Sequence, residues 1–444
     1  MAQLQQQYPT ELVVIGVHSA KFPAEKLTTN IRAAVMRHGI HHPVINDADF
    51  DVWSQYGVRA WPTVVLVDPV GKVVGQQSGE ITAEGFTPVI DAMIADFDGR
   101  GLLDRTPISG VQPAIDHEPP RVLQYPSKLL PAIGDRLFIA DTGHHRMLEV
   151  QLTLDGLSGE IARTFGTGEP GLQDGHINQA SFHGPHGMAL LGNTLYVADT
   201  ENHAIRAIDL VREQVRTVAG TGTMGRTLSP NGETPTTIDL RSPWALAATA
   251  QVLFIAMAGS HQIWMLIDEK TLGIFAGTGA ETLLDGPRTE AAFNQPSDIV
   301  FDMGHLFVAD AEASAIRAIA LTEEPTVMTL VGLGLFEFGD IDGVGADVRL
   351  QHPTGLTTDH AGIVYVADSY NHKVKTLDPT TGEVKTLIGT GVPGTFDDPF
   401  AQAQLYEPEG LAIHQGKLYI ADTNNHLIRV ADLATQQVQT LRLR

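Results

Sequence analysis

The chain has 444 residues, with 29 Lys and Arg against 52 Asp and Glu, which gives a formal net charge of −23 at pH 7. An apolar fraction of 43% is ordinary for a folded protein and argues against extended disorder. The chain has no cysteine to form disulfides, thiolate zinc sites or redox thiols, and its acidity argues against a nucleic-acid partner, because phosphate binding needs basic surface.

No segment predicts a membrane partner. Residues 1–7 lack the basic and apolar regions of a signal peptide. The most apolar stretch, residues 244–258, is interrupted by Thr249 and Gln251 and is too short to cross a bilayer. We therefore expect a soluble protein in the cytoplasm.

Residues 1–97 predict a small α/β domain. Residues 11–17 are an apolar run typical of a buried strand, whereas apolar residues in 24–38 recur at helical spacing. The helical positions are Leu27, Ile31, Ala34 and Val35. The remaining expected elements are a strand near 43–46, a helix over 50–56, a hairpin with its turn at 68–71 and a closing helix near 82–95.

Two motifs in this segment resemble the later part of a thioredoxin-like domain. They are Trp61-Pro62-Thr63, where that family keeps a cis-proline, and residues 16–22, which resemble a strand-to-helix junction. The resemblance implies that His18 and Trp61 flank a former active-site groove and that His18, Trp61 and Pro62 now maintain the fold. The family's first strand and its Cys-x-x-Cys have no counterpart in this chain, so we expect a partial, redox-inactive domain.

The missing first strand would lie between two of the strands that remain. Either the sheet closes over the gap, or the domain is truncated, or a separate polypeptide supplies the missing half. Truncation or loss is the favoured interpretation. Residues 98–124, rich in Pro, Gly and charge, are expected to form a linker.

Residues 125–444 contain a repeated motif in which an apolar strand ends in Ala-Asp-Thr/Ser and is followed by His and an Ile/Val-Arg/Lys step. The anchor positions recur at spacings of 53 to 58 residues: Asp141, Asp199, Met257, Asp310, Asp368 and Asp422. A proline precedes each strand pair: Pro126, Pro185, Pro243, Pro296, Pro353 and Pro408. Most repeats end in Gly-x-Gly, as at residues 166–168.

Each repeat predicts four short strands that are apolar on both faces. Such a sheet buries both faces only between two neighbouring sheets, and radial stacking of six sheets achieves this. A β-helix would repeat over a much shorter period. The sequence therefore predicts a mainly β protein, with a six-bladed propeller at 125–444 preceded by the partial α/β thioredoxin-like domain at 1–97.

The motif with Pro-x-Gly upstream and Gly-Thr-Gly downstream resembles the NHL repeat, a family of six-bladed propellers. The whole chain is similar to NHL-repeat proteins that carry an N-terminal thioredoxin-like domain. Segments 16–23, 139–146, 198–203, 255–264 and 366–373 support this resemblance. This resemblance implies the architecture of the protein much more firmly than its biochemical activity.

The repeated Asp and His residues are expected to be structural. They are Asp141, His145, Asp199, His203, His261, Asp310, Asp368, His372, Asp422 and His426, with Ser314 in place of one histidine. A residue present in every blade lies on a ring too wide for one metal ion. We expect Asp to accept N–H groups of its own turn, Asn202, Asn371 and Asn425 to adopt positive φ, and His to pack or hydrogen-bond between blades.

Binding is expected where the repeat varies. The residue after each conserved proline begins the innermost strand at the channel: Ser127, His186, Trp244, Ser297, Thr354 and Glu409. His186 and Glu409 are its strongly polar members, expected to face each other across the channel, and Met257 marks the most divergent blade. The loops on this side of the propeller form the candidate binding face.

No metal or other cofactor is assigned, although acidic pairs on the same face leave calcium as an alternative. They are Asp174-Gly175, Asp285-Gly286, Asp342-Gly343 and Asp397-Asp398. Tight-turn chemistry accounts for Asp-Gly equally well.

The predicted function is non-catalytic binding of a protein or peptide, with acidity favouring a basic partner. One alternative is a fragment of a thioredoxin-like oxidoreductase whose Cys-x-x-Cys lies upstream or on a partner chain. Another is a metal-dependent lyase or hydrolase in the propeller channel, for which the sequence offers no complete set of catalytic residues.

Overall fold

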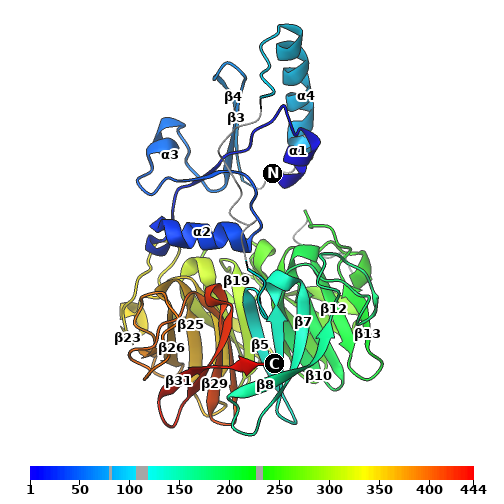
Figure 1. Cartoon of the computed structure of the whole chain (residues 1–444). Coiled ribbons are helices and arrows are strands. Elements are labelled where there is room, and N and C mark those ends of the chain that lie inside the picture. The colour runs from blue at the N-terminus through cyan, green and yellow to red at the C-terminus, as the bar shows by residue number, and fades with distance from the viewer. Residues whose placement is uncertain (80–82, 107–118, 227–233) are drawn as a thin grey trace. The chain divides into compact units, whose positions relative to one another are not determined.

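The computed structural model describes residues 1–79, 83–106, 119–226 and 234–444. The chain divides into two compact units, Met1–Pro120 and Arg121–Arg444, each described here by itself (Figure 1). The expected linker falls partly at 107–118, outside the described residues. None of the helices in the described ranges is long and apolar enough to cross a bilayer.

The first unit contains two separate two-stranded sheets. β1 (Gly16–His18) pairs in parallel with β2 (Val44–Asn46), and β3 (Thr63–Val67) pairs antiparallel with β4 (Val73–Ser78). The helices among its described residues are α1 (Ala2–Gln7), α2 (Thr28–Arg37), α3 (Asp51–Gln55) and α4 (Ala83–Gly99), with a 3₁₀ turn at Pro23–Lys26. The described strands therefore do not close over the gap between the two sheets.

The prediction of a buried strand at 11–17 is wrong. Only Gly16–His18 is a strand, and the alternating residues Val13, Ile15 and Val17 are 53%, 51% and 42% exposed. Among the described strands, β2 is the only partner of β1, so its other edge is open. Leu27 is also exposed, because α2 starts one residue later.

The second unit is a propeller whose inner strands begin at the conserved prolines. Blade 1 comprises β5 (Pro126–Ala132), β6 (Arg136–Asp141), β7 (Arg146–Leu152) and β8 (Ser158–Phe165). Blade 2 comprises β10 (Pro185–Leu191), β11 (Thr194–Asp199), β12 (Ala204–Asp209) and β13 (Gln214–Ala219). Blade 3 comprises β14 (Pro243–Ala248), β15 (Val252–Met257), β16 (Gln262–Ile267) and β17 (Thr271–Ala276).

The other three blades follow the same antiparallel order. Blade 4 comprises β19 (Pro296–Asp302), β20 (His305–Asp310), β21 (Ala315–Ala320) and β22 (Thr326–Val331). Blade 5 comprises β24 (Pro353–Thr358), β25 (Val364–Asp368), β26 (Lys373–Asp378) and β27 (Glu383–Ile388). Blade 6 comprises β28 (Pro408–His414), β29 (Lys417–Asp422), β30 (Leu427–Asp432) and β31 (Gln437–Thr440).

Short strands in the connecting loops extend three of these blades. β9 (Gly175–His176) pairs with β13, β18 (Gly286–Pro287) pairs with β22, and β23 (Gly343–Val344) pairs with β27. Each joins the outermost strand and covers its free edge.

The six sheets close into a ring, as the repeat predicts. The inner strands contact one another in the order β5, β10, β14, β19, β24, β28 and back to β5. In Figure 1, β5 and β29, from the first and last blades, lie beside each other. Six apolar clusters fill the junctions between neighbouring blades, which explains why each sheet is apolar on both faces.

The ring is closed by residues that follow the fourth strand of the last blade. That strand, β31, ends at Thr440, and β32 (Arg442–Leu443) pairs in parallel with β8 of blade 1. The N–H of Ile161 also donates to the carbonyl of Arg444 at 3.0 Å. The C-terminal residues thus connect blade 6 to the outer edge of blade 1.

Candidate functional site

The repeat aspartates tie together distant parts of their own blade. In blade 2, Asp199 Oδ1 accepts the backbone N–H of His183 at 2.7 Å. Its Oδ2 accepts hydrogen bonds from Asn202 Nδ2 and Arg206 Nη1, both at 2.8 Å. Asp199 and Arg206 are fully buried, so the carboxylate links the start of the inner strand to the third strand.

The expectation that these aspartates accept the N–H groups of their own turn is therefore wrong. The donated N–H comes from the residue two positions before the conserved proline: Gln124 to Asp141, Asn294 to Asp310, Gln351 to Asp368 and Tyr406 to Asp422. Burial raises the pKa of Asp310, Asp368 and Asp422 to about 6, against the lowering effect of Arg317, Lys375 and Arg429.

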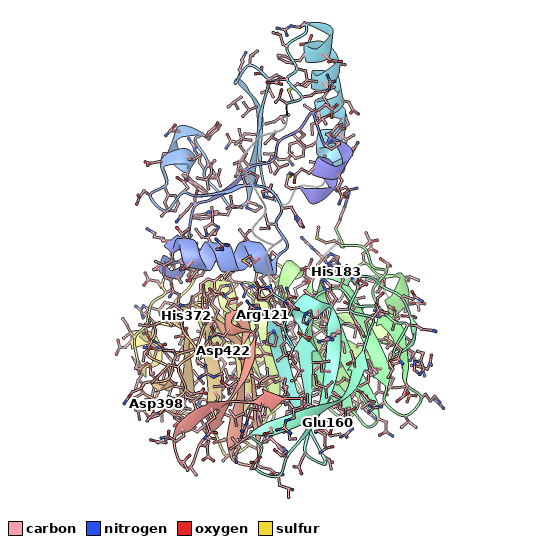
Figure 2. All side chains as sticks on the ribbon, in the orientation of Figure 1. Arg121, Glu160, His183, His372, Asp398 and Asp422 are labelled. Atoms are coloured by element: carbon pink, nitrogen blue, oxygen red, sulfur yellow. The ribbon has the colours of Figure 1, made fainter. Side chains whose placement is uncertain are left out.

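The repeat histidines connect adjacent blades. His145 Nδ1 accepts the N–H of Gly184 at 3.1 Å, and His372 Nδ1 accepts that of Glu407 at 3.2 Å. Figure 2 labels His372 in the second unit. The same bond recurs from Ser242 to His203, Gln295 to His261 and Tyr125 to His426, and from His352 to the hydroxyl of Ser314. Burial lowers the pKa of His145, His372 and His426 to about 4, which keeps the accepting nitrogen unprotonated.

The positive-φ position is also different from the prediction. It belongs to the histidine, not to the preceding asparagine: φ is 48° at His203 and 55° at His372. Asn202 ends a short 3₁₀ turn instead, and its side chain bonds to Asp199. The histidine thus combines a left-handed backbone with an inter-blade hydrogen bond.

The acidic pairs in the loops are matched to buried cations. Asp174 accepts from Arg206 Nη2 at 2.7 Å and from the N–H of Thr217 at 3.0 Å. The equivalent pairs are Asp285 with Arg317, Asp342 with Lys375 and Asp397 with Arg429. These contacts account for the acids without calcium, and in the described ranges no group of three or more His, Asp or Glu residues could hold a metal ion.

Blade 3 replaces the buried ion pair with apolar side chains. Met257 is in the position of Asp199 and Trp264 in that of Arg206, and both lie in the core cluster between blades 2 and 3. Trp264 Nε1 donates to Gln262 Oε1 at 2.9 Å, which satisfies its polar atom. The assignment of Met257 to the binding face is therefore wrong, because its side chain has no exposed surface.

The six residues that follow the conserved prolines form what we call the mouth ring: Ser127, His186, Trp244, Ser297, Thr354 and Glu409. Ser297 Oγ donates to the carbonyl of Pro353 in the next blade at 3.1 Å, whereas Thr354 Oγ1 lies 2.5 Å from Ser369 Oγ of its own blade. His186 and Trp244 keep intermediate exposure, and their rings lie 4.5 Å apart. These two aromatic rings are the accessible part of the mouth ring.

A buried ion pair fills the channel beside the mouth ring. Lys128 Nζ of blade 1 lies 2.8 Å from Asp298 Oδ2 of blade 4, directly across the ring, and also donates to the carbonyl of Thr354. Sequence reasoning missed this pair. Its signal is that Lys128 and Asp298 occupy the position at which the other blades have Gly187, Ala245, Gly355 and Gly410.

His186 has a defined tautomer in the mouth. Its Nδ1 lies 2.9 Å from the carbonyl of Gly184, which can only accept, so Nδ1 carries the proton. Burial lowers the pKa of His186, with Glu409 opposing this shift. The ring is therefore neutral at pH 7, and Nε2 is a hydrogen-bond acceptor.

His186 and Glu409 are not opposite each other, contrary to the sequence expectation. They belong to blades 2 and 6, which flank blade 1. The electrostatic influence of Glu409 on His186 reflects this proximity. His186 thus lies next to Trp244 and within the electrostatic influence of Glu409, which belongs to the blade opposite that of Trp244.

In the first unit, the predicted groove residues lie close together. Trp61 Nε1 donates to the carbonyl of Ser19 at 2.8 Å, next to His18 at the end of β1. The Trp61–Pro62 peptide is cis, as predicted. Trp61 also packs on Trp53 with ring centroids 4.7 Å apart, while remaining 47% exposed.

The fold and these contacts define a class of protein. Residues 182–208, 350–377 and 405–431 match the NHL repeat model. The chain therefore contains NHL repeats within its six-bladed β-propeller.

Two curated proteins are similar to nearly the whole chain. NHL repeat-containing protein 2 of Homo sapiens is 40% identical over 465 residues, covering 97% of this chain and 63% of the human protein. Protein SUPPRESSOR OF QUENCHING 1, chloroplastic, of Arabidopsis thaliana is 42% identical over 454 residues, covering 97% of this chain and 42% of that protein. The chain thus spans less than two thirds of the length of these relatives.

Among solved structures, a streptogramin B lyase gives a TM-score of 0.45 at 9% identity and covers 72% of this chain and 84% of the lyase chain. A nidogen/laminin complex gives a TM-score of 0.44 at 17% identity and covers 67% of this chain and 90% of that chain. These likenesses carry no functional argument.

Proposed function

We propose that the propeller is a non-catalytic binding module whose mouth ring recognises a positively charged side chain of a protein or peptide. Trp244 offers an aromatic face to a cation, and His186 Nε2 offers a hydrogen-bond acceptor. Glu409 adds negative charge that acts on His186. All three groups favour the same kind of ligand, and the net charge of −23 attracts basic partners.

The single observation that carries this proposal is the contact between the half-buried His186 and Trp244 rings at the mouth. The hydroxyls of the mouth ring already have hydrogen-bond partners in their own or a neighbouring blade, so they support the channel wall. The Lys128 ammonium is likewise paired with Asp298 inside the channel. Recognition is therefore assigned to the exposed aromatic side of the ring.

Binding of fluorescein-labelled peptides, measured by fluorescence anisotropy, tests this assignment. We expect Arg- and Lys-rich peptides to bind and acidic peptides of equal length not to bind. Glu409→Gln and Trp244→Leu should each weaken binding about tenfold, equivalent to about 1.4 kcal/mol, whereas Glu160→Gln on β8 should not. The proposal would be contradicted if acidic and basic peptides bound with equal affinity. It would also be contradicted if neither Glu409→Gln nor Trp244→Leu weakened peptide binding.

Elemental analysis separates this function from catalysis by a channel metal. A stoichiometric transition metal in the purified protein would favour the lyase or hydrolase alternative. We expect none, because the Lys128 ammonium already provides a positive charge on the axis. Fractionation of cells that express the protein tests the proposed cytoplasmic location.

We further propose that the first unit is a thioredoxin-like domain without redox activity. The open edge of β1, the neighbouring apolar side chains and the cis Trp61–Pro62 peptide support this proposal. The alternative oxidoreductase needs a strand with Cys-x-x-Cys from an upstream segment or a partner. Sequencing the DNA upstream of Met1 tests that alternative, and turnover of a dithiol substrate by this chain alone would contradict the inactive assignment.

A further inference from the structure

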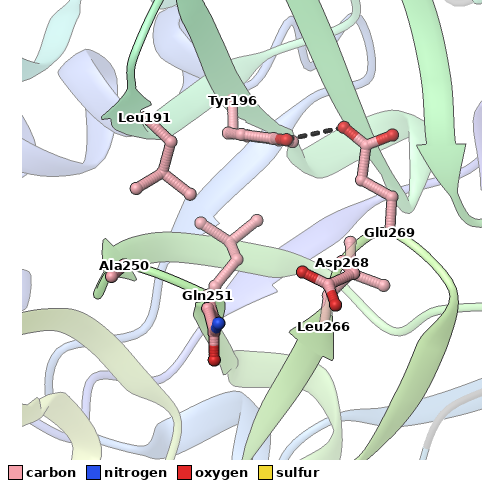
Figure 3. A pocket seen from close by; sticks show the side chains of 8 residues that line it. Leu191, Tyr196, Ala250, Gln251, Leu266, Asp268 and Glu269 are labelled. Atoms are coloured by element: carbon pink, nitrogen blue, oxygen red, sulfur yellow. Dashed lines mark hydrogen bonds between the residues drawn. The ribbon is translucent and has the colours of Figure 1, made fainter.

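The propeller face opposite the mouth ring carries a pocket between blades 2 and 3 (Figure 3). The pocket has a volume of about 310 Å³. Its lining comes from strands β10, β11, β15 and β16 and from the turns before β15 and after β16: Leu191, Tyr196, Ala250, Gln251, Leu253, Leu266, Asp268 and Glu269. Side chains from two blades therefore form one small site.

The inner walls of this pocket are apolar. Leu253 and Leu266 are buried in the cluster between blades 2 and 3, and Leu191 packs against the same cluster. Tyr196 contributes its ring to the same cluster. These walls accommodate a short hydrocarbon chain.

One of the two acidic side chains that line the pocket already has an ion-pair partner within the protein. Glu269 Oε1 accepts from Tyr196 Oη at 2.6 Å and from Arg216 Nη2 at 2.7 Å, and Oε2 lies 2.7 Å from Arg216 Nη1. Although burial acts in the opposite direction, these hydrogen bonds hold the pKa of Glu269 below its ordinary value. Glu269 is thus a fixed part of the wall.

The other acid is available to a ligand. Among the described contacts, Asp268 has no hydrogen bond or ion pair, and its carboxylate lines the pocket (Figure 3). Lys270 follows in the same turn but is not a lining residue. Asp268 therefore places an uncompensated negative charge at the end of an apolar cavity.

We propose that this pocket binds a primary alkylammonium group, with its hydrocarbon chain between Leu191, Leu253 and Leu266 and its ammonium on Asp268. An apolar stem and a cationic end match the two halves of the lining. Free aliphatic amines and lysine side chains share this chemistry. The site is separate from the mouth ring and does not depend on the function proposed for it.

Methyl NMR of the full chain with labelled leucine side chains tests the proposal. The probes are n-pentylammonium, 1-pentanol, pentanoate and Nα-acetyl-lysine N-methylamide. We expect pentylammonium to shift the Leu191, Leu253 and Leu266 methyl signals with the highest affinity and pentanoate with the lowest. Binding of the lysine amide as well identifies a protein side chain as the natural source, whereas binding of pentylammonium alone identifies a free amine.

Two variants separate the charge from the cavity. Asp268→Asn should lower the affinity for pentylammonium about fivefold and leave pentanol unchanged. Ala250→Leu, at an exposed rim position, should block all the probes by filling the cavity. Glu323→Gln, in the corresponding turn of blade 4, removes an equal charge elsewhere and should have no effect.

Three results would overturn the proposal, of which the first two concern relative affinities. One is equal affinity for pentylammonium and pentanoate, and the other is a loss of pentylammonium binding in Glu323→Gln equal to that in Asp268→Asn. Absence of any leucine methyl shift with pentylammonium would also overturn it. Peptide binding at the mouth ring is measured with separate variants, so failure of one site is distinguishable from failure of the other.

Discussion

The repeat histidine acts as a hydrogen-bond acceptor between blades. Its Nδ1 receives a backbone N–H that is otherwise buried at the junction, as at His372, where the donor is Glu407. Ser314 makes the equivalent bond through its hydroxyl. This position in the repeat therefore requires a hydrogen-bond acceptor close to the backbone. A hydroxyl group can take the place of the imidazole.

Substitution of His372 tests this role. His372→Ala leaves the N–H of Glu407 without its acceptor and should destabilise the protein by about 1–3 kcal/mol. His372→Ser restores a hydroxyl as in blade 4 and should recover part of this loss. Urea unfolding measures both, and equal stability of the Ala and Ser variants would contradict the acceptor role.

Burial of His372 predicts how the stability of the protein depends on pH. The pKa of His372 is about 4 in the folded protein, below its ordinary value of 6.5, because the side chain is buried. The unfolded chain therefore binds more protons between pH 6.5 and 4, and the contribution of His372 to stability falls as pH decreases through this window. At pH 5 this contribution should be about 2 kcal/mol smaller than at pH 7.5.

The test compares wild type with His372→Ser, because the repeat aspartates shift in the opposite direction. Asp310, Asp368 and Asp422 have raised pKa values of about 6, so their folded forms bind protons more readily as the pH falls. The stability advantage of wild type over His372→Ser should shrink from pH 7.5 to pH 5. An advantage that stays constant or grows would show that His372 is not buried as a neutral base.

At the scale of elements, the inner strands β24 and β28 need glycine where they meet the backbone of a neighbouring inner strand. A Cβ at Gly410 would lie 2.1 Å from the carbonyl oxygen of Ser127, and one at Gly355 would lie 2.0 Å from that of Glu409. Neither glycine has a positive φ, so close approach of backbones is the constraint. At these two positions the neighbouring backbone leaves no room for a Cβ atom.

Gly410→Ala should therefore destabilise the propeller by about 3 kcal/mol or more, because backbone must move to admit the methyl group. Gly273→Ala is the matched control, since nothing lies within 4 Å of a Cβ there and its φ is not positive. Thermal unfolding of both variants measures the difference. Comparable melting temperatures would contradict the steric argument.

Blade 3 shows that the same strands can be packed with apolar side chains in place of the buried ion pair. Met257 and Trp264 together replace the Asp–Arg pair of the other blades and join the core between blades 2 and 3. Exchange of a buried ion pair for apolar residues keeps a blade stable only when both partners change, because a single buried charge is costly. The divergence of this blade therefore reflects packing.

At the scale of the whole molecule, the Lys128–Asp298 pair connects blades that lie opposite each other in the ring. The pair is buried, and Asp298 Oδ2 also accepts the N–H of Leu356 at 2.8 Å. Contacts to blades 5 and 6 through the carbonyls of Thr354 and Glu409 extend the network. Four blades are thus held at one point on the axis.

A double-mutant cycle measures this connection. Lys128→Met leaves the Asp298 carboxylate buried without its cation and should cost about 3–5 kcal/mol. Asp298→Asn should cost less, and the double variant should cost less than the sum of the two single changes. Additive effects in urea unfolding would contradict a direct interaction across the axis.

Much of the architecture follows from the sequence. The period of 53 to 58 residues and strands apolar on both faces predict six radially stacked sheets, and the structure has them. The buried strand at 11–17 was predicted from its apolar residues alone. This prediction is wrong, because the burial of a strand depends on a neighbouring strand. A local pattern does not indicate whether that neighbour is present.

The candidate site was predictable only in part. Position in the repeat indicates that His186, Trp244 and Glu409 begin inner strands, but their order around the ring and the proximity of His186 to Glu409 arise from closure. Met257 shows the converse, since a break in the repeat marked a change in the core. Variation along a sequence does not distinguish an exposed position from a repacked one.

By itself, the sequence determined the number of blades, the position of each inner strand and the absence of thiol chemistry, because periodicity and residue type are local properties of the chain. Only the tertiary structure decided which side chains meet. Lys128 and Asp298 are 170 residues apart, and the alkylammonium pocket joins side chains from two blades. Such contacts depend on ring closure, which brings together groups that no sequence spacing relates.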